Sequence, residues 1–170
     1  TLLGWDAFQQ ARSAIIFSSL FSSPVSSQFG EWDKICYKNI EQAHQQYMTQ
    51  LDTYHALADT HASQFRLLHT RGDVQAHLSE WRNAKPGEEI PVGFVILMEG
   101  ADGVRSPQEL PMWWARGLRI IGPAWVGTRF SGGTDEPGPL TKEGYALLDG
   151  MMEIGFMLDV SHMDEQAVYQ

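Results

Sequence analysis

Cysteine, basic residues and long apolar runs are scarce in this chain of 170 residues. The single cysteine, Cys36, excludes an internal disulfide, so the fold needs no oxidising compartment. Twelve Lys and Arg against 21 Asp and Glu give a net charge of -9, which argues against nucleic acid and anionic membranes as partners, because both bind basic faces. No stretch approaches the roughly 18 consecutive apolar residues of a membrane helix. We therefore expect no membrane segment. The composition favours a cytoplasmic location and leaves open a signal or anchor elsewhere in a longer polypeptide.

The residues that are present suit one globular domain. Hydrophobic residues make up 43% of the chain and aromatic residues 11%, which is enough to bury a core. Both ends are abrupt, because the first residues contain no methionine and residues 164–170 resemble the first turns of a helix. We therefore expect residues 1–170 to be an incomplete domain that lacks its N-terminal and C-terminal parts.

Short apolar runs alternate with long amphipathic segments. The runs predict buried strands at residues 13–21, 92–98, 119–121 and 155–160. Helices are predicted at residues 32–68, 107–116 and 142–154. Two more follow predicted caps: one begins at the cap formed by residues 71–73 and runs to residue 83, and the other begins after Asp164. Cys36 is expected to be a small buried residue of the first helix. Strands that are apolar on both faces and alternate with helices are typical of parallel α/β sheets. About four parallel strands fit a doubly wound sheet or part of a (β/α)8 TIM-type barrel.

Polar side chains follow the two most apolar strands. Glu99 comes directly after "VILM", and Ser161-His162 comes directly after "MLDV". The carboxyl ends of parallel strands carry functional residues, so a carboxylate and an imidazole there could ligate a divalent metal or act as acid and base. The structural alternative is that Glu99 pairs with an arginine such as Arg119 and that His162 begins the last helix.

Four segments, taken together, resemble the membrane dipeptidase (renal dipeptidase) family, the M19 metallopeptidases. They read "TLLGWDAFQQARSAIIFSSLF", "GFVILMEGAD", "WWARGLRIIGPAW" and "PGPLTKEGYALLDGMMEIGFMLDVSHM". The resemblance covers essentially the whole chain and is weakest between residues 30 and 90. It implies a (β/α)8 barrel whose two zinc ions, bridged by a hydroxide, hydrolyse dipeptides.

The family resemblance also implies individual roles. The glutamate of its Glu-Gly motif bridges both zinc ions and corresponds to Glu99, and the histidine of its Ser-His motif ligates one zinc and corresponds to His162. The family's His-x-Asp pair would lie before Thr1. A second metal-binding histidine, a substrate-binding arginine and a catalytic aspartate would lie after Gln170. We therefore assign no catalytic residue within the chain, and we expect the chain alone to bind metal poorly and to be inactive.

Trp125 occupies the position at which many members of the family carry a histidine that contacts the substrate, counted from Gly117-Leu118-Arg119. Indole cannot take up or release a proton. Either Trp125 forms a different substrate pocket, or Arg129 supplies the positive charge instead. Dipeptides or related small amides are the expected substrates and a homodimer is possible. The alternatives are an amidohydrolase-type enzyme with a non-peptide substrate and a non-catalytic barrel that acts as a binding module.

Overall fold

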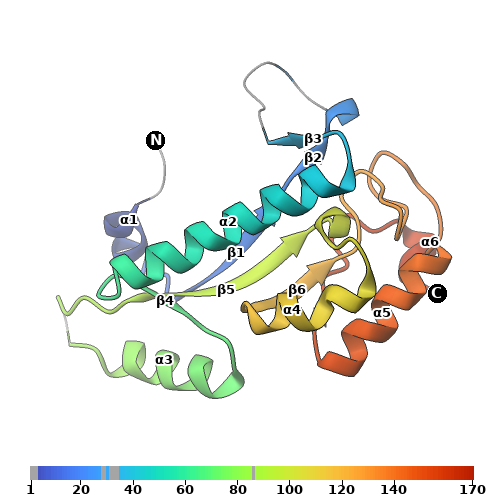
Figure 1. Cartoon of the computed structure of the whole chain (residues 1–170). Coiled ribbons are helices and arrows are strands. Elements are labelled where there is room, and N and C mark those ends of the chain that lie inside the picture. Colours follow the sequence, from blue (N-terminus) through green and yellow to red (C-terminus); the bar gives the residue numbers. More distant parts are fainter. Residues whose placement is uncertain (1–3, 28–29, 31–34, 86) are drawn as a thin grey trace.

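A parallel five-stranded sheet forms the centre of the molecule (Figure 1). The computed structural model describes residues 4–27, 30, 35–85 and 87–170. The strand order is β1-β5-β6-β7, and β4 also pairs with β5. The strands are β1 (Ile15–Phe21), β4 (Phe65–Leu67), β5 (Val92–Glu99), β6 (Leu118–Gly122) and β7 (Met157–Leu158). A separate small sheet pairs β2 (Ser23–Pro24) with β3 (Cys36–Tyr37).

Four of the six helices in the described part of the chain begin at a side-chain cap. They are α1 (Trp5–Gln10), α2 (Ile40–Thr60), α3 (Arg71–Asn83), α4 (Leu110–Ala115), α5 (Lys142–Ile154) and α6 (Glu165–Val168). Single 3-10 turns are η1 (Val25–Ser27), η2 (Ala101–Gly103) and η3 (Pro107–Glu109). The side chains of Asn39, Thr70, Thr141 and Asp164 each accept a backbone N–H in the first turn of the helix that follows, which stabilises these helix starts.

The two faces of the sheet differ in burial. In β1, Ser18 and Leu20 are buried, whereas Phe17 on the opposite face is 61% exposed, as expected when side chains alternate along a strand. In Figure 1, α2 and α4 lie in front of the sheet. Nothing among the described residues closes its other face, where an open cleft of about 480 Å³ is lined by Ile15, Phe17 and Val95, among others. This arc of parallel strands with helices outside is part of a (β/α)8 barrel, as predicted.

The register of the sheet brings particular residues to one level at its carboxyl edge. Phe21 of β1 pairs with Glu99 of β5, and Glu99 pairs with Gly122 of β6. The backbone N–H of Asp159 then donates to the carbonyl of Ile121, 3.0 Å away. The ends of four strands therefore meet along one line, where the sequence places its candidate site.

The helix predicted for residues 32–68 is wrong at both ends. Residues 31–34 lie outside the described part of the chain, and α2 covers only Ile40–Thr60. Cys36 is a half-buried residue of strand β3 and not a helical one. Phe65 continues the apolar spacing of the helix, but it belongs to β4 and stacks on Phe94 with 5.1 Å between ring centroids. Its apolar character therefore reflects packing within the sheet.

The last predicted strand, at residues 155–160, is shorter and more exposed than expected. β7 has two residues, and Met157 and Leu158 are 53% and 43% exposed. The expectation of a buried strand is wrong, because β7 pairs with β6 on one side and meets no further strand among the described residues. The other three predicted strands and the helix at 142–154 are confirmed.

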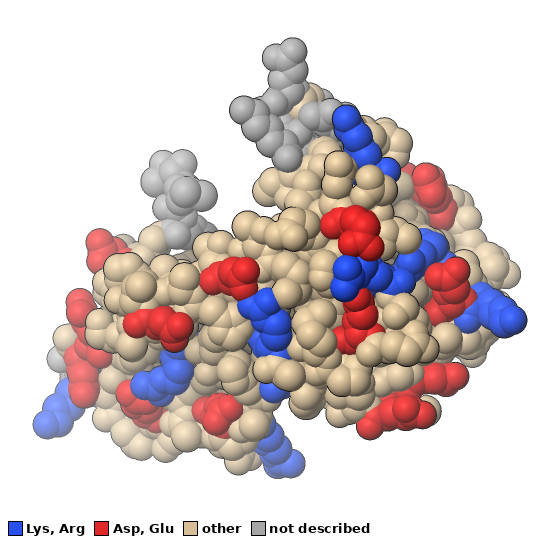
Figure 2. All heavy atoms as spheres, viewed as in Figure 1, with Lys and Arg blue, Asp and Glu red and all other residues tan. Residues whose placement is uncertain are grey.

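Charge is mixed over the visible surface. Figure 2 shows acidic and basic side chains interspersed on the face that it draws. Within the described ranges, no helix combines the length and the apolar character that crossing a membrane requires.

Candidate metal centre

Glu99 and His162 meet at the carboxyl edge of the sheet. Glu99 is the last residue of β5, and His162 follows β7, with β6 lying between these two strands. The Oε1 atom of Glu99 lies 3.2 Å from Nε2 of His162, and both side chains are about one third exposed, at 30% and 35%. Carboxylate oxygen and imidazole nitrogen are donors that zinc accepts. The fold therefore brings two candidate ligands, far apart in the sequence, into direct contact.

Ser19 and Tyr47 hold Glu99 from two directions. The hydroxyl of Ser19 donates to Oε2 of Glu99 over 3.1 Å. The hydroxyl of Tyr47 lies 2.8 Å and 2.9 Å from the carbonyl oxygens of Glu99 and Gly100. Burial raises the pKa of Tyr47, so this phenol remains a neutral donor. The side chain and the backbone of Glu99 are thus fixed independently.

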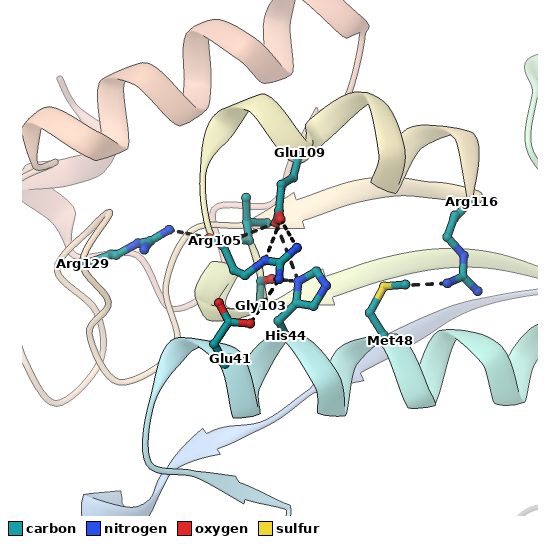
Figure 3. A network of polar contacts seen from close by, with 9 residues as sticks. Glu41, His44, Met48, Gly103, Arg105, Glu109, Arg116 and Arg129 are labelled. Atoms are coloured by element: carbon teal, nitrogen blue, oxygen red, sulfur yellow. Dashed lines mark hydrogen bonds and ion pairs between the residues drawn. The ribbon is translucent and has the colours of Figure 1, made fainter.

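A polar network anchors the segment that follows Glu99 (Figure 3). His44 of α2 lies with Nδ1 2.8 Å from the carbonyl oxygen of Gly103. Arg105 donates to Glu109 over 2.6 Å and to Glu41 of α2 over 3.1 Å. Residues 103–105 are therefore attached to the long helix α2, so the turn after Glu99 is held on the same helix that carries Tyr47.

His162 has an unusual backbone conformation. Its φ of 65° lies in the left-handed region, which among the described non-glycine residues is shared only with Arg12. This conformation is uncommon for a residue with a Cβ atom and is often retained at functional sites. Its Nδ1 atom lies 2.9 Å from Oγ1 of Thr134. The imidazole is thus held at both nitrogens, by Thr134 on one side and by Glu99 on the other.

The two structural alternatives for these residues are wrong. Arg119 donates to the carbonyl oxygens of His69 and Trp114 over 2.6 Å and 2.7 Å, and its guanidinium lies 3.9 Å from the ring centroid of Trp114. It is therefore engaged away from Glu99. The last helix is capped by Asp164, whose side chain accepts the N–H of Gln166. His162 consequently does not begin this helix.

The family model described as membrane dipeptidase (peptidase family M19) matches residues 7–170. The chain belongs to peptidase family M19. Two curated relatives are uncharacterised: a protein in the PQQ-III 3' region of Acinetobacter calcoaceticus, 28% identical over 139 residues, and a protein in the pqqA 5' region of Klebsiella pneumoniae, 30% identical over 113 residues. The matches cover 76% and 61% of this chain but 41% and 42% of those proteins.

Solved structures show the same fold as this M19 chain. The metallopeptidase dipeptidase AC of family M19 superposes with a TM-score of 0.79 at 20% identity, over 96% of this chain and 48% of that one. The probable dipeptidase PvdM from Pseudomonas aeruginosa superposes with a TM-score of 0.78 at 17% identity, and the match covers 98% of this chain and 42% of that one. An amidohydrolase from Pseudomonas aeruginosa superposes with a TM-score of 0.71 at 12% identity, and the match covers 99% of this chain and 45% of that one. The chain thus spans less than half the length of these proteins.

Trp125 of the M19 chain lies at the carboxyl edge of the sheet. Its ring meets that of Phe21 edge to face, with 4.8 Å between centroids and an interplanar angle of 80°. Because Phe21 pairs in register with Glu99, Trp125 is close to the level of the candidate ligands. Its role in substrate binding stays a prediction.

Arg129 is engaged by neighbouring protein groups. Its Nη2 donates to the carbonyl oxygen of Val104, its Nε lies 3.3 Å from the carboxylate of Glu143, and its guanidinium lies 4.3 Å from the ring centroid of Phe130. Figure 3 shows Arg129 reaching toward the segment that follows Glu99. These contacts give it a structural role, and substrate binding by Arg129 stays a prediction.

Three residues around the site were not identified from the sequence. Ser19 shares a face of β1 with Phe21, so the alternation along the strand could have indicated it. Thr134 and Tyr47 carry no such signal, because their contacts depend on how a loop and a helix pack. The site has two donors of the types that zinc prefers, but the described ranges contain no group of three or more His, Cys, Asp or Glu that could hold a metal. The donors therefore fit part of a zinc site.

Proposed function

We propose that this chain supplies part of the active site of a zinc-dependent hydrolase that cleaves dipeptides, with Glu99 and His162 as metal ligands. The observation that carries the proposal is the 3.2 Å approach of Glu99 Oε1 to His162 Nε2 at the carboxyl edge of a parallel sheet. Functional residues of (β/α)8 barrels lie at this edge. Membership of family M19 supports peptidase chemistry.

The geometry of Glu99 suits a bridging ligand. Oε1 faces His162 and Oε2 faces the hydroxyl of Ser19; because its two oxygens point to different groups, Glu99 would be able to serve more than one cation beside His162. Zinc ions bound there would activate a water molecule and polarise the scissile carbonyl. Ser19 holds the carboxylate of Glu99 and Tyr47 holds its backbone carbonyl, so the side chain is fixed in place, and Nε2 of His162 faces it.

We also propose that residues 1–170 are an incomplete domain. Two donors are fewer than the three protein ligands that catalytic zinc ordinarily uses, and the curated relatives are more than twice as long as the segment that matches this chain. The remaining ligands would come from polypeptide outside this chain. On this proposal the 170 residues alone bind zinc weakly and hydrolyse no dipeptide at a measurable rate.

Zinc content tests the ligand assignment. In the natural polypeptide that carries this chain, Glu99→Ala should remove most of the bound zinc, measured by elemental analysis after dialysis. Glu153→Ala is a matched control, because Glu153 is exposed on α5, and it should retain the metal. Unchanged zinc in Glu99→Ala would refute the assignment. A parent protein with neither zinc nor hydrolytic activity would favour the alternative of a non-catalytic binding module.

The aromatic wall of Trp125 and Phe21 favours a second candidate, a hydrolase of the same type acting on a non-peptide amide. Indole cannot exchange a proton with the substrate, and two aromatic rings favour an apolar group beside the metals. Trp125→His should raise turnover of dipeptides, whereas Trp125→Phe, which keeps an aromatic ring, should not. No gain for Trp125→His across a panel of dipeptides would count against a role of Trp125 in selecting the substrate.

A further inference from the structure

The glycine-rich loop between β6 and α5 reaches His162. Oγ1 of Thr134, in this loop, lies 2.9 Å from Nδ1 of His162, although 28 residues separate them in the sequence. We propose that Thr134 is a positioning residue that orients the imidazole of His162 so that Nε2 faces Glu99. This inference rests on the proposed function, in which Nε2 is the ligand atom.

Two glycines let the loop come close enough for this contact. A Cβ atom at Gly133 would lie 2.4 Å from the carbonyl oxygen of Val126 and 2.7 Å from that of Trp125. A Cβ atom at Gly132 would lie 2.3 Å from the backbone nitrogen of Gly138. Real Cβ atoms do not approach other atoms so closely, because van der Waals repulsion rises steeply. Glycine at these positions is therefore a requirement of the loop's shape.

Backbone hydrogen bonds fix the loop at Thr134 and two residues before it. The N–H of Thr134 donates to the carbonyl oxygen of Trp125 over 3.0 Å. The N–H of Asp164, two residues after His162, donates to the carbonyl oxygen of Gly132 over 3.1 Å. The loop is thus bonded both to Trp125 and to the turn that carries His162, and Thr134 itself makes the bond to Trp125.

A hydroxyl is chemically suited to this position because it can both donate and accept. When the lone pair of Nε2 serves a metal, Nδ1 carries the proton and donates to Oγ1 of Thr134. When Nε2 carries the proton and donates to Glu99, the hydroxyl of Thr134 donates to Nδ1 instead. The same contact therefore persists in both states of the imidazole. Partners of this kind fix the tautomer and ring orientation of metal-binding histidines.

Two substitutions separate the hydroxyl from the rest of the side chain. Thr134→Val keeps the shape and removes the hydroxyl, and Thr134→Ser keeps the hydroxyl. Because Thr134 is exposed, neither change should unfold the protein. In the natural polypeptide labelled with ¹⁵N-histidine and stripped of metal, Thr134→Val should shift the Nδ1 resonance of His162 and Thr134→Ser should not. Zinc affinity should fall roughly tenfold or more in Thr134→Val and be largely retained in Thr134→Ser.

The outcomes distinguish this inference from the proposed function. An unchanged Nδ1 resonance in Thr134→Val would overturn the positioning role, whatever the zinc affinity, and so would equal losses in the valine and serine variants. If the parent binds no zinc but the resonance still depends on the hydroxyl, the positioning role stands and the metal assignment fails. Should Thr134→Val not fold, Thr134→Ala, which also removes the hydroxyl and places only a small side chain at this exposed position, should shift the same resonance. No shift there would overturn the inference.

Discussion

Replacing Tyr47 by phenylalanine removes one hydroxyl from the core and keeps the ring. The side chain is fully buried, and its hydroxyl lies 2.8 Å and 2.9 Å from the carbonyl oxygens of Glu99 and Gly100. Both carbonyls lose this donor in Tyr47→Phe. A buried acceptor left without its partner costs about 1–3 kcal/mol, so we expect the free energy of unfolding to fall by about 2 kcal/mol. For a chain of this size that corresponds to a melting temperature lower by roughly 4–8 °C.

Urea unfolding and thermal melting measure this loss, and Tyr54→Phe is the matched control. Tyr54 lies on the same helix, is only half-buried, and donates to the carbonyl of Ser19 over a longer 3.3 Å. Its loss should cost less than about 1 kcal/mol. Equal destabilisation by the two substitutions would refute the view that the carbonyls of Glu99 and Gly100 depend on Tyr47.

Two further predictions concern charge and packing. Burial raises the pKa of Asp102 from 3.8 to about 6, so the folded protein holds the proton of this carboxyl more tightly than the unfolded chain does. The contribution of Asp102 to the free energy of unfolding is therefore full below about pH 4 and is lost as the pH rises through about 6. Asp102→Asn should therefore match the parent at about pH 4 and exceed its unfolding free energy by on the order of 2 kcal/mol at about pH 8. Equal urea unfolding curves at the higher pH would contradict this. In α5, a Cβ atom at Gly144 would lie 2.0 Å from the carbonyl oxygen of Phe130, whereas at Gly150 it would meet the flexible Leu110 side chain at 2.8 Å. Thermal melting should show Gly144→Ala destabilised by at least about 2 kcal/mol and Gly150→Ala changed by less than about 1 kcal/mol, because helix propensity offsets its crowding. Similar losses in both would show that the carbonyl of Phe130 can move.

Features with strong local causes could be predicted from the sequence. The helix α5 follows from Thr141 as a cap and ends at Gly155, which adopts a φ of 100°. Glu99 and His162 could be singled out because the strand-end rule needs only the position of an apolar run. The strand β4 could not be identified, since three residues are too few to show a period of two and Phe65 continues the spacing of α2.

Contacts made by loops could not be predicted from the sequence in the way that helix caps and strand ends could. The contact of Thr134 with His162 depends on the path of the whole segment from Trp125 to Gly138, and no residue near Thr134 indicates it. Ser19 lies between these cases, because its place in a strand was predictable but its hydrogen bond to Glu99 required the register between β1 and β5.

The register between β5 and β6 has a consequence for the spacing of the two candidate ligands. Neighbouring strands are about 4.8 Å apart, so the strands that carry Glu99 and His162, separated by β6, lie roughly 10 Å from each other. At the level of Glu99 the intervening strand carries Gly122. The carboxylate and the imidazole can bridge that gap because β6 contributes no side chain between them. A Cβ atom at position 122 would lie 3.4 Å from the carbonyl oxygen of Asp159 and 3.6 Å from that of Met98, which are ordinary contact distances, so alanine would fit there and only a longer side chain would reach the space between the two ligands.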